Sequence, residues 1–238
     1  MNSIKTERED ILMNRVDEKE EKRKRIRDRI SVVLNGLLVI FTGIGSFITF
    51  TDQSVGTGLK AYGLQNLKFF TVLSNVFCGG IALVWLLWHR QKKAFPVILK
   101  LMAASAVGLT FLIVIAFLRP MYPQLQLYVN GNLWFHLIVP VTGMAEFLLL
   151  SQEEVLPFKT TLLSGLPVLV YGVCYLGNIY VNGIGIWPDT NDWYGFLKWG
   201  YPAGFLIFAV SILLEWGIAL LLAFLRHCLS GQRGQGMN

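Results

Sequence analysis

The sequence is poor in the residues that build disulfide frameworks and metal sites. Its 238 residues include only three cysteines and three histidines, and these are scattered along the chain. A disulfide framework needs clustered cysteines in even number, and zinc needs at least three convergent donors. We therefore expect neither a disulfide framework nor a metal ion, and no motif indicates another cofactor.

Charged residues are also scarce, at 15% of the chain, whereas hydrophobic residues make up 54% and the mean hydropathy is +0.52. A soluble domain alternates buried and wet faces, and the strands of a membrane β-barrel alternate strictly over about ten residues. This chain instead has apolar runs of roughly twenty residues, the length at which a helix crosses ~30 Å of hydrocarbon. The sequence therefore predicts an all-α, multi-pass protein of the cell membrane. The six predicted transmembrane helices are Ser31–Phe50, Phe69–Trp88, Val97–Leu118, Leu133–Leu150, Thr160–Val181 and Trp199–Leu225.

Acidic residues are too few to balance the basic ones, and the formal net charge is +6. Of the 21 Lys and Arg residues, 17 fall in the N-terminal block, between residues 90 and 100, at Lys159 or near the C-terminus. The other four, on the opposite side of the predicted bundle, are Lys60, Lys68, Arg119 and Lys198. Because Lys and Arg collect on the cytoplasmic side of membrane proteins, this asymmetry predicts that both termini are cytoplasmic. Topology explains the basic residues, so no nucleic-acid partner is expected.

The charge pattern divides the chain into three regions. In the N-terminal block, acidic residues precede a Lys/Arg run, an order that supports an exposed helix. We expect residues 1–30 to form a charged cytoplasmic helix, residues 31–228 the six-helix transmembrane domain, and residues 229–238 a cytoplasmic tail. The first apolar run lacks a small-residue cleavage pattern, so we expect it to remain as a membrane anchor.

A polar stripe at the start of the second predicted span is the first candidate site. Its members, three or four residues apart and therefore on one helical face, are Lys68, Thr71, Ser74 and Asn75. A single Thr or Ser in a membrane helix usually bonds back to a carbonyl of the preceding turn, which implies no function. Four polar residues on one face are costly against lipid, however, and indicate a protein-lined or water-filled site.

His136 is the only histidine inside a predicted span. It lies about four residues below the outer end of the fourth span, and Thr71 lies about three residues below the outer end of the second, so the two share one depth. A histidine at this place can also serve only as a hydrogen-bonding group between helices. A threonine hydroxyl and an imidazole at one depth nevertheless suit a nucleophile and its general base.

Depth selects further candidates in the same outer layer. Tyr175 and Asn178 approach this layer on the fifth span. Arg119 lies at the outer end of the third span, where a carboxylate or a lipid phosphate could pair with it. Two acids, Glu146 and Glu215, lie deeper, and we expect both to have structural roles between helices.

Several of these residues carry a family resemblance. The relevant pieces are the run Phe69–Asn75, the pair His136 and Pro140, the acid Glu146, and the segment 171–183 before a loop rich in Trp and Asp. In their order and spacing they resemble the bacterial branch of the androgen-induced protein family, whose vertebrate members include the androgen-dependent TFPI-regulating protein. The resemblance implies six transmembrane helices and the hydrolysis of fatty acid esters of hydroxy fatty acids.

The resemblance also implies that Thr71 is the nucleophile and His136 the base, so we expect a membrane lipid-ester hydrolase that works near the outer leaflet. Its partners would be membrane lipid and a lipid-ester substrate. The residues expected to bind the oxyanion or the substrate are Lys68, Ser74, Asn75, Arg119, Tyr175 and Asn178. Two alternatives stay open: a lipid acyltransferase with the same site, and a non-catalytic lipid-binding or transport protein. The sequence does not set the oligomeric state.

Overall fold

The computed structural model describes residues 2–51, 61–149, 156–186 and 189–235, and within these ranges the chain is helical, without a β-strand. The long helices are α1 (Asn2–Thr51), α2 (Phe70–Arg90), α3 (Val97–Ile113), α6 (Val139–Leu149), α8 (Leu166–Asn182) and α9 (Tyr201–Gln235). The short ones are η1 (Gly63–Lys68), α4 (Arg119–Met121), α5 (Gly131–Leu133) and α7 (Phe158–Thr161). Three irregular turns, η2 (Val114–Leu118), η3 (Trp134–Ile138) and η4 (Leu162–Gly165), continue neighbouring helices.

Six helical stretches are long and apolar enough to cross a membrane. They are Glu18–Thr51, Phe70–Arg90, Val97–Met121, Gly131–Leu149, Phe158–Asn182 and Tyr201–Leu229. The all-α prediction and the number of apolar helices are therefore confirmed. Five of the predicted spans agree with these stretches to within a few residues, and the predicted end at Leu150 lies outside the described residues.

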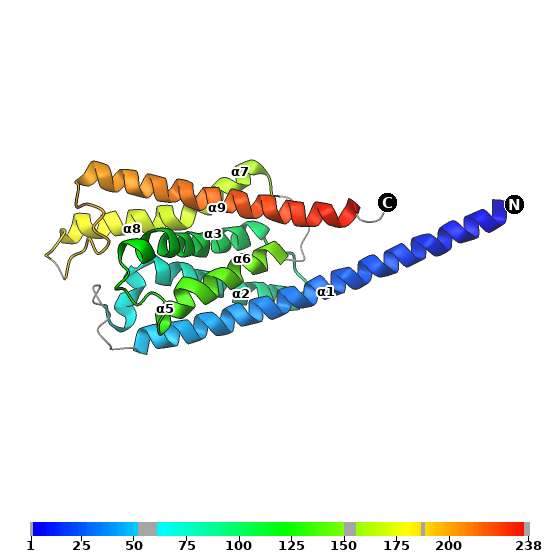
Figure 1. Ribbon diagram of the computed structural model, residues 1–238, viewed down its shortest axis with the longest axis horizontal. Helices are drawn as coiled ribbons and strands as arrows, with labels where there is room; N and C mark the ends of the chain where they lie inside the picture. Colours follow the sequence, from blue (N-terminus) through cyan, green and yellow to red (C-terminus); the bar gives the residue numbers. More distant parts are fainter. Residues whose placement is uncertain (1, 52–60, 150–155, 187–188, 236–238) are drawn as a thin grey trace.

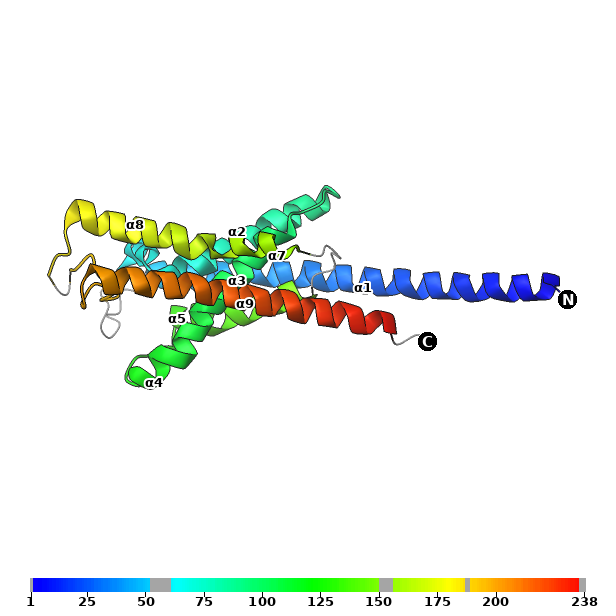
Figure 2. The ribbon, with the colours of Figure 1, turned by 90° about the horizontal axis from the view of Figure 1, so that it is seen from above.

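The first helix differs from the predicted division at residue 30. Helix α1 is one unbroken helix of 50 residues that contains both the charged block and the first apolar segment. It is therefore about 75 Å long, and its N-terminal part projects beyond the bundle (Figures 1 and 2). A contact between Asp28 and His89, with 3.4 Å between Oδ2 and Nε2, ties α1 to the last turn of α2. At the other end of the chain, α9 continues to Gln235, so the predicted tail begins as helix.

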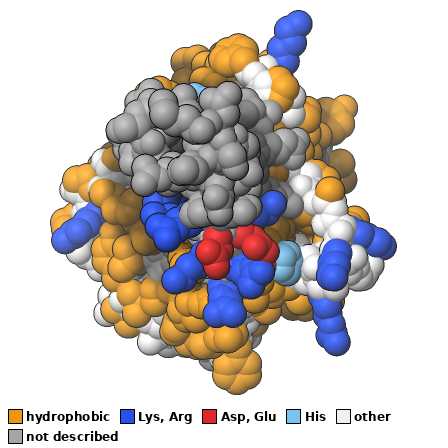
Figure 3. All heavy atoms as spheres, turned by 90° about the vertical axis from the view of Figure 1, so that its right-hand side faces the viewer, with side chains coloured by type: hydrophobic (Ala, Val, Ile, Leu, Met, Phe, Trp, Pro, Cys, Tyr) orange, Lys and Arg blue, Asp and Glu red, His pale blue; other side chains and the backbone are white. Residues whose placement is uncertain are grey.

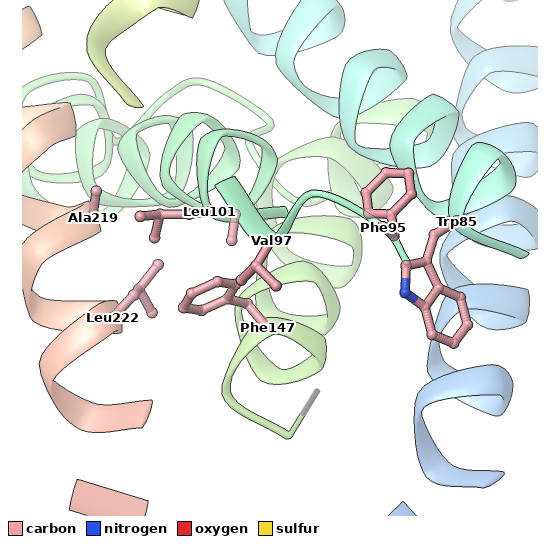
Figure 4. Packing of buried hydrophobic residues seen from close by; sticks show 8 residues of the cluster. Trp85, Phe95, Val97, Leu101, Phe147, Ala219 and Leu222 are labelled. Carbon is pink, nitrogen blue, oxygen red and sulfur yellow. The ribbon is translucent and has the colours of Figure 1, made fainter. Parts of the chain in front are cut away.

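Helix α3 lies at the centre of the bundle, in contact with α2, α6 and α9. Its residues 103–110 are all buried, and most of them are small, which lets the neighbouring helices approach closely. Figure 4 shows part of the core at one end of α3, where Val97 and Leu101 lie near Phe147 of α6 and Leu222 of α9.

The start of α1 and the end of α9 lie at the same end of the bundle, as an even number of helical stretches running alternately up and down requires (Figure 1). Figure 3 views this end and shows many Lys and Arg side chains on it. At the opposite end, η1, α5 and the segment between α8 and α9 come together. Both predicted catalytic residues belong to this opposite end.

Candidate active site

Thr71 lies in the first turn of α2, where a helix has N–H groups without an intrahelical partner. The chain is extended at Phe69, with φ −87° and ψ 132°, and turns into the helix at Phe70. The Phe70 N–H donates to the Tyr194 hydroxyl over 3.0 Å. The N–H and the hydroxyl of Thr71 also interact with this hydroxyl. The immediate polar neighbour of Thr71 therefore comes from the segment between α8 and α9, and sequence reasoning missed it.

Tyr194 is held in place by other aromatic rings. It stacks on Phe196, with ring centroids 5.0 Å apart, and on Tyr175, at 6.1 Å. Burial raises the pKa of Tyr194 to about 12, although hydrogen bonds from groups such as the Phe70 N–H oppose the rise. At neutral pH the side chain is thus an uncharged hydroxyl that can donate a hydrogen bond, and it is unsuited to act as a base.

Lys68 belongs to the same aromatic cluster. Its carbonyl accepts a hydrogen bond of 2.8 Å from the Tyr171 hydroxyl, and Trp193 Nε1–H donates to that hydroxyl over 3.0 Å. The Lys68 ammonium lies over the rings of Phe69 and Trp193, 5.3 and 5.7 Å from their centroids. Burial lowers the pKa of Lys68, and the charge of Asp189 opposes this. The structure therefore brings the predicted Lys68 and Thr71 to one aromatic cluster, with Lys68 beside Trp193 and Thr71 beside Tyr194.

Tyr175 and Asn178 fasten the segment that carries Tyr194. The Tyr175 hydroxyl donates to Asp192 Oδ1 over 2.5 Å, and the other carboxylate oxygen accepts the Leu197 N–H at 3.0 Å. Asn178 Nδ2 donates to Asn191 Oδ1 over 3.2 Å. Both predicted residues thus lie near the site, and in this structure they position the loop.

Ser74 and Asn75 turn toward the interior of the bundle. Ser74 Oγ forms a hydrogen bond of 3.0 Å with Thr110 Oγ1 of α3. Asn75 Nδ2 donates to two carbonyl oxygens, that of Thr71 at 2.6 Å and that of Phe135 at 2.9 Å. Both amide hydrogens are used in this way, so the Asn75 amide has none left for an oxyanion. Its contacts instead join the first turn of α2 to η3, directly before His136.

His136 lies in η3, a π-helical turn, which is a rare distortion often found at functional sites. Its buried ring places Nδ1 2.7 Å from the Leu127 carbonyl oxygen. Because a carbonyl only accepts hydrogen bonds, Nδ1 carries the proton and Nε2 of the neutral ring keeps its lone pair. No residue that the structure describes forms a hydrogen bond with Nε2. The ring is therefore oriented as a general base requires.

In the described part of the chain, no hydrogen bond joins Thr71 to His136: Thr71 meets Tyr194, and His136 meets Leu127. The backbones of their two helices are nevertheless adjacent through Asn75. Arg119 is apart from this group, because it is exposed at the start of α4 with its guanidinium 5.8 Å from the centroid of the Tyr128 ring. Figure 2 shows α4 on the opposite side of the bundle from α8.

A second polar cluster lies nearer the end that carries the termini. Lys100 and Glu146 are only 3% and 2% exposed, and Lys100 Nζ is 3.3 Å from Glu146 Oε1. Asn35 lies between them: its Nδ2 donates to Glu146 over 2.6 Å, and its Oδ1 accepts a hydrogen bond from Lys100. Lys100 is thus the buried partner of an acid on a neighbouring helix. The structural role expected for Glu146 agrees with this pairing.

Among the residues that the structure describes, no three or more His, Cys, Asp or Glu side chains are grouped so that they could hold a metal ion. Glu215 is fully buried, and its Oε2 accepts the Val168 N–H at 3.3 Å. This hydrogen bond joins α9 to the start of α8.

Comparison with known proteins adds no relative: no family model, no curated protein and no solved structure matches the chain.

Proposed function

We propose that this protein is a membrane-embedded hydrolase of lipid esters, in which Thr71 is the nucleophile and His136 the general base. The observation that carries the proposal is the double hydrogen bond of Asn75. It fixes the Thr71 carbonyl and the carbonyl before His136 within 3 Å of one amide nitrogen. The nucleophile-bearing turn and the base-bearing turn are thereby locked side by side inside an apolar bundle.

The orientation of His136 also supports this role. The Leu127 carbonyl holds the proton on Nδ1, so Nε2 can accept the proton of a hydroxyl. A threonine hydroxyl is a weak nucleophile, and an adjacent base is the usual way to activate it. Catalytic hydrogen bonds often form only when substrate is bound, so a Thr71 side chain that faces Tyr194 in the free protein is compatible with transfer to His136.

The proposed reaction has two stages. Thr71 Oγ attacks the ester carbonyl carbon and His136 Nε2 takes its proton. The imidazolium then gives the proton to the leaving alcohol, and the acyl group stays on Thr71. In the second stage a water molecule loses a proton to Nε2 and attacks the acyl carbon, and Thr71 leaves with the returned proton. Fatty acid esters of hydroxy fatty acids are the proposed substrates.

Membrane insertion is supported by the many large apolar side chains that face outward from the six apolar helices. Examples are Phe47, Val173 and Phe224, which are more than half exposed. The excess of Lys and Arg at the end with both termini supports a cytoplasmic position for that end, and it persists without Lys100. The proposed site then lies near the outer leaflet, where a lipid ester could enter from the side.

Activity is tested with purified protein on such lipid esters, together with labelling by a fluorophosphonate that reacts with serine and threonine nucleophiles. Thr71→Ala and His136→Ala should each lose most turnover, and the double variant should be little worse, because the two residues act as one unit. Thr142 offers a matched control, since its hydroxyl only bonds back to Ile138 O over 2.7 Å. Thr142→Ala should keep both turnover and labelling.

Full turnover in Thr71→Ala would overturn the proposal. Product formed only when an alcohol acceptor is added would identify an acyltransferase that uses the same site. Topology is tested separately with Gly234→Cys in a variant without Cys174 and Cys228. A reagent that cannot enter intact cells should leave this cysteine unlabelled, and labelling from outside would place the termini on the other side.

A further inference from the structure

The group that faces the Thr71 hydroxyl in this structure is a tyrosine that the reaction above does not use. Tyr194 accepts the Phe70 N–H over 3.0 Å, and the Thr71 N–H and hydroxyl interact with the same phenol oxygen. The phenol oxygen therefore lies next to the atom that would attack the ester. In a tetrahedral intermediate the negatively charged oxygen is two bonds from the attacking atom, so it forms close to the place where Tyr194 already is.

Two of the residues expected to stabilise this charge have other contacts in the structure. Asn75 gives both amide hydrogens to carbonyl oxygens, and the Lys68 ammonium lies over the rings of Phe69 and Trp193. The Asn75 amide is therefore not available to an oxyanion, and a further donor beside Thr71 would serve it. Such donors work best when they are preorganised and shielded from water, because they then require no reorganisation during the reaction.

Tyr194 is half-buried and is preorganised in this way. Its ring is stacked between neighbours at fixed positions, and Asp192, two residues earlier, is fastened by Tyr175 and by the Leu197 N–H. The Phe70 N–H occupies an acceptor position of the phenol oxygen, and the hydroxyls of Tyr171 and Thr71 are the side-chain groups that interact with the phenol. A hydrogen bond accepted by a hydroxyl also strengthens the bond that the hydroxyl donates.

We propose that Tyr194 is a catalytic residue that donates a hydrogen bond to the oxyanion formed when Thr71 attacks the ester. This inference rests on the proposed function, because it requires Thr71 to be the nucleophile. No proton is transferred from Tyr194: its hydroxyl stabilises charge while His136 moves the proton. The carbonyl oxygen of the substrate then takes the place beside the phenol that the Thr71 hydroxyl has in the free protein.

The test is Tyr194→Phe, which removes the hydroxyl and keeps the stacked ring. Loss of one oxyanion donor lowers kcat by roughly 10²–10³-fold. We expect such a loss in kcat with little change in KM, because the donor acts on the transition state. Affinity for a trifluoromethyl ketone of the fatty acyl chain, which forms an oxyanion when Thr71 adds to it, should fall by a similar factor. Affinity for the product fatty acid should not change. Tyr180 is 90% exposed, and Tyr180→Phe is the control that should match wild type.

Parallel measurement of Thr71→Ala separates the two claims. If Thr71→Ala is inactive while Tyr194→Phe has full kcat, the role of Tyr194 is overturned and the hydrolase remains. If both variants keep full activity, the hydrolase proposal itself fails. If Tyr194→Phe does not fold, 3-fluorotyrosine at position 194 replaces it, since this analogue keeps both ring and hydroxyl but ionises at lower pH. The alkaline fall of kcat should then move to lower pH, and an unmoved profile would refute the donor role.

Discussion

The buried pair of Lys100 and Glu146 allows a stability prediction with a defined magnitude. The perturbation is Lys100→Met, which keeps an unbranched chain of similar length and removes the charge. It leaves Glu146 with the Asn35 amide, 2.6 Å away, as its hydrogen-bond donor. It also leaves Asn35 Oδ1 without the donor that Lys100 supplies.

The expected loss follows from the distance and the burial. At 3.3 Å and an effective dielectric constant of about 20, the Coulomb attraction between Lys100 and Glu146 is about 5 kcal/mol. Both side chains are almost fully buried, so removal of the Lys100 charge leaves the Glu146 carboxylate without its positive partner in a place that water does not reach. Breaking such a pair costs ~3–5 kcal/mol of the free energy of unfolding, and we expect Lys100→Met to fall in this range.

The double variant Lys100→Met with Glu146→Leu separates pairing from packing. This variant removes both charges of the pair. Its main loss is that the Asn35 amide no longer bonds to Lys100 and Glu146 and keeps only its bond to the Ser31 carbonyl, at 2.8 Å. We expect a loss of about 1–3 kcal/mol, less than that of the single Lys100→Met variant.

The assay is reversible unfolding in mixed detergent micelles, followed by helix content from far-UV circular dichroism. Lys198 is exposed over the ring of Trp199, and Lys198→Met is the matched control, expected within about 0.5 kcal/mol of wild type. A Lys100→Met variant within 1 kcal/mol of wild type, or a double variant less stable than Lys100→Met, would refute the reasoning.

Three further predictions concern the described helices and use the same unfolding assay. A Cβ on Gly79 would lie 2.5–2.6 Å from three side-chain atoms of Thr42, so Gly79→Ala should lower the free energy of unfolding by ~1–3 kcal/mol. A Cβ on Gly80 would meet no atom within 4 Å, so Gly80→Ala is the control and should not destabilise the fold. Equal losses in the two variants would contradict this packing. Glu215→Gln keeps an acceptor for the Val168 N–H and should change the free energy of unfolding by less than about 1 kcal/mol, and a larger loss would show that the carboxylate charge is needed. Asn75→Leu removes two hydrogen bonds, the one to the Phe135 carbonyl that joins α2 to η3 and the one to the Thr71 carbonyl within α2. It should cost about 1–2 kcal/mol, since hydrogen bonds in membrane proteins average ~0.6 kcal/mol each; unchanged stability would argue against the bridge.

The helices could be predicted from the sequence because their signal is local. An apolar run of about twenty residues specifies a helix whatever its neighbours are. The predicted division at residue 30 is different, because it marks only a change from charged to apolar residues. Such a change does not end a helix, and α1 continues through it. The π-helical turn around His136 was also beyond prediction, since one extra residue in a turn leaves the apolar pattern almost unaltered.

The candidate site was predicted only in part, and the reason is again physical. Spacing along one helix groups Lys68 with Thr71, and depth places His136 in the same layer. Neither spacing nor depth states which side chain a loop brings to Thr71, and Tyr194 enters the site through tertiary packing of the loop. The pairing of Lys100 with Glu146 was not predicted either, because a count of charges per region does not reveal that a lysine has an acid on a neighbouring helix as its partner.

Thr71 and His136 both lie where the backbone departs from a regular helix, and this explains their position in the bundle. A regular helix satisfies its own backbone groups, and in an apolar environment it has none to offer to a reaction or to a catalytic side chain. Thr71 lies in a first turn, where the Phe70 N–H is still available to bind Tyr194. His136 lies in a π-helical turn, and its ring is oriented by a carbonyl of the non-helical connection at Leu127. Both places depend on backbone groups that leave the helical pattern, and such groups are concentrated where the non-helical connections meet at the end of the bundle opposite the termini.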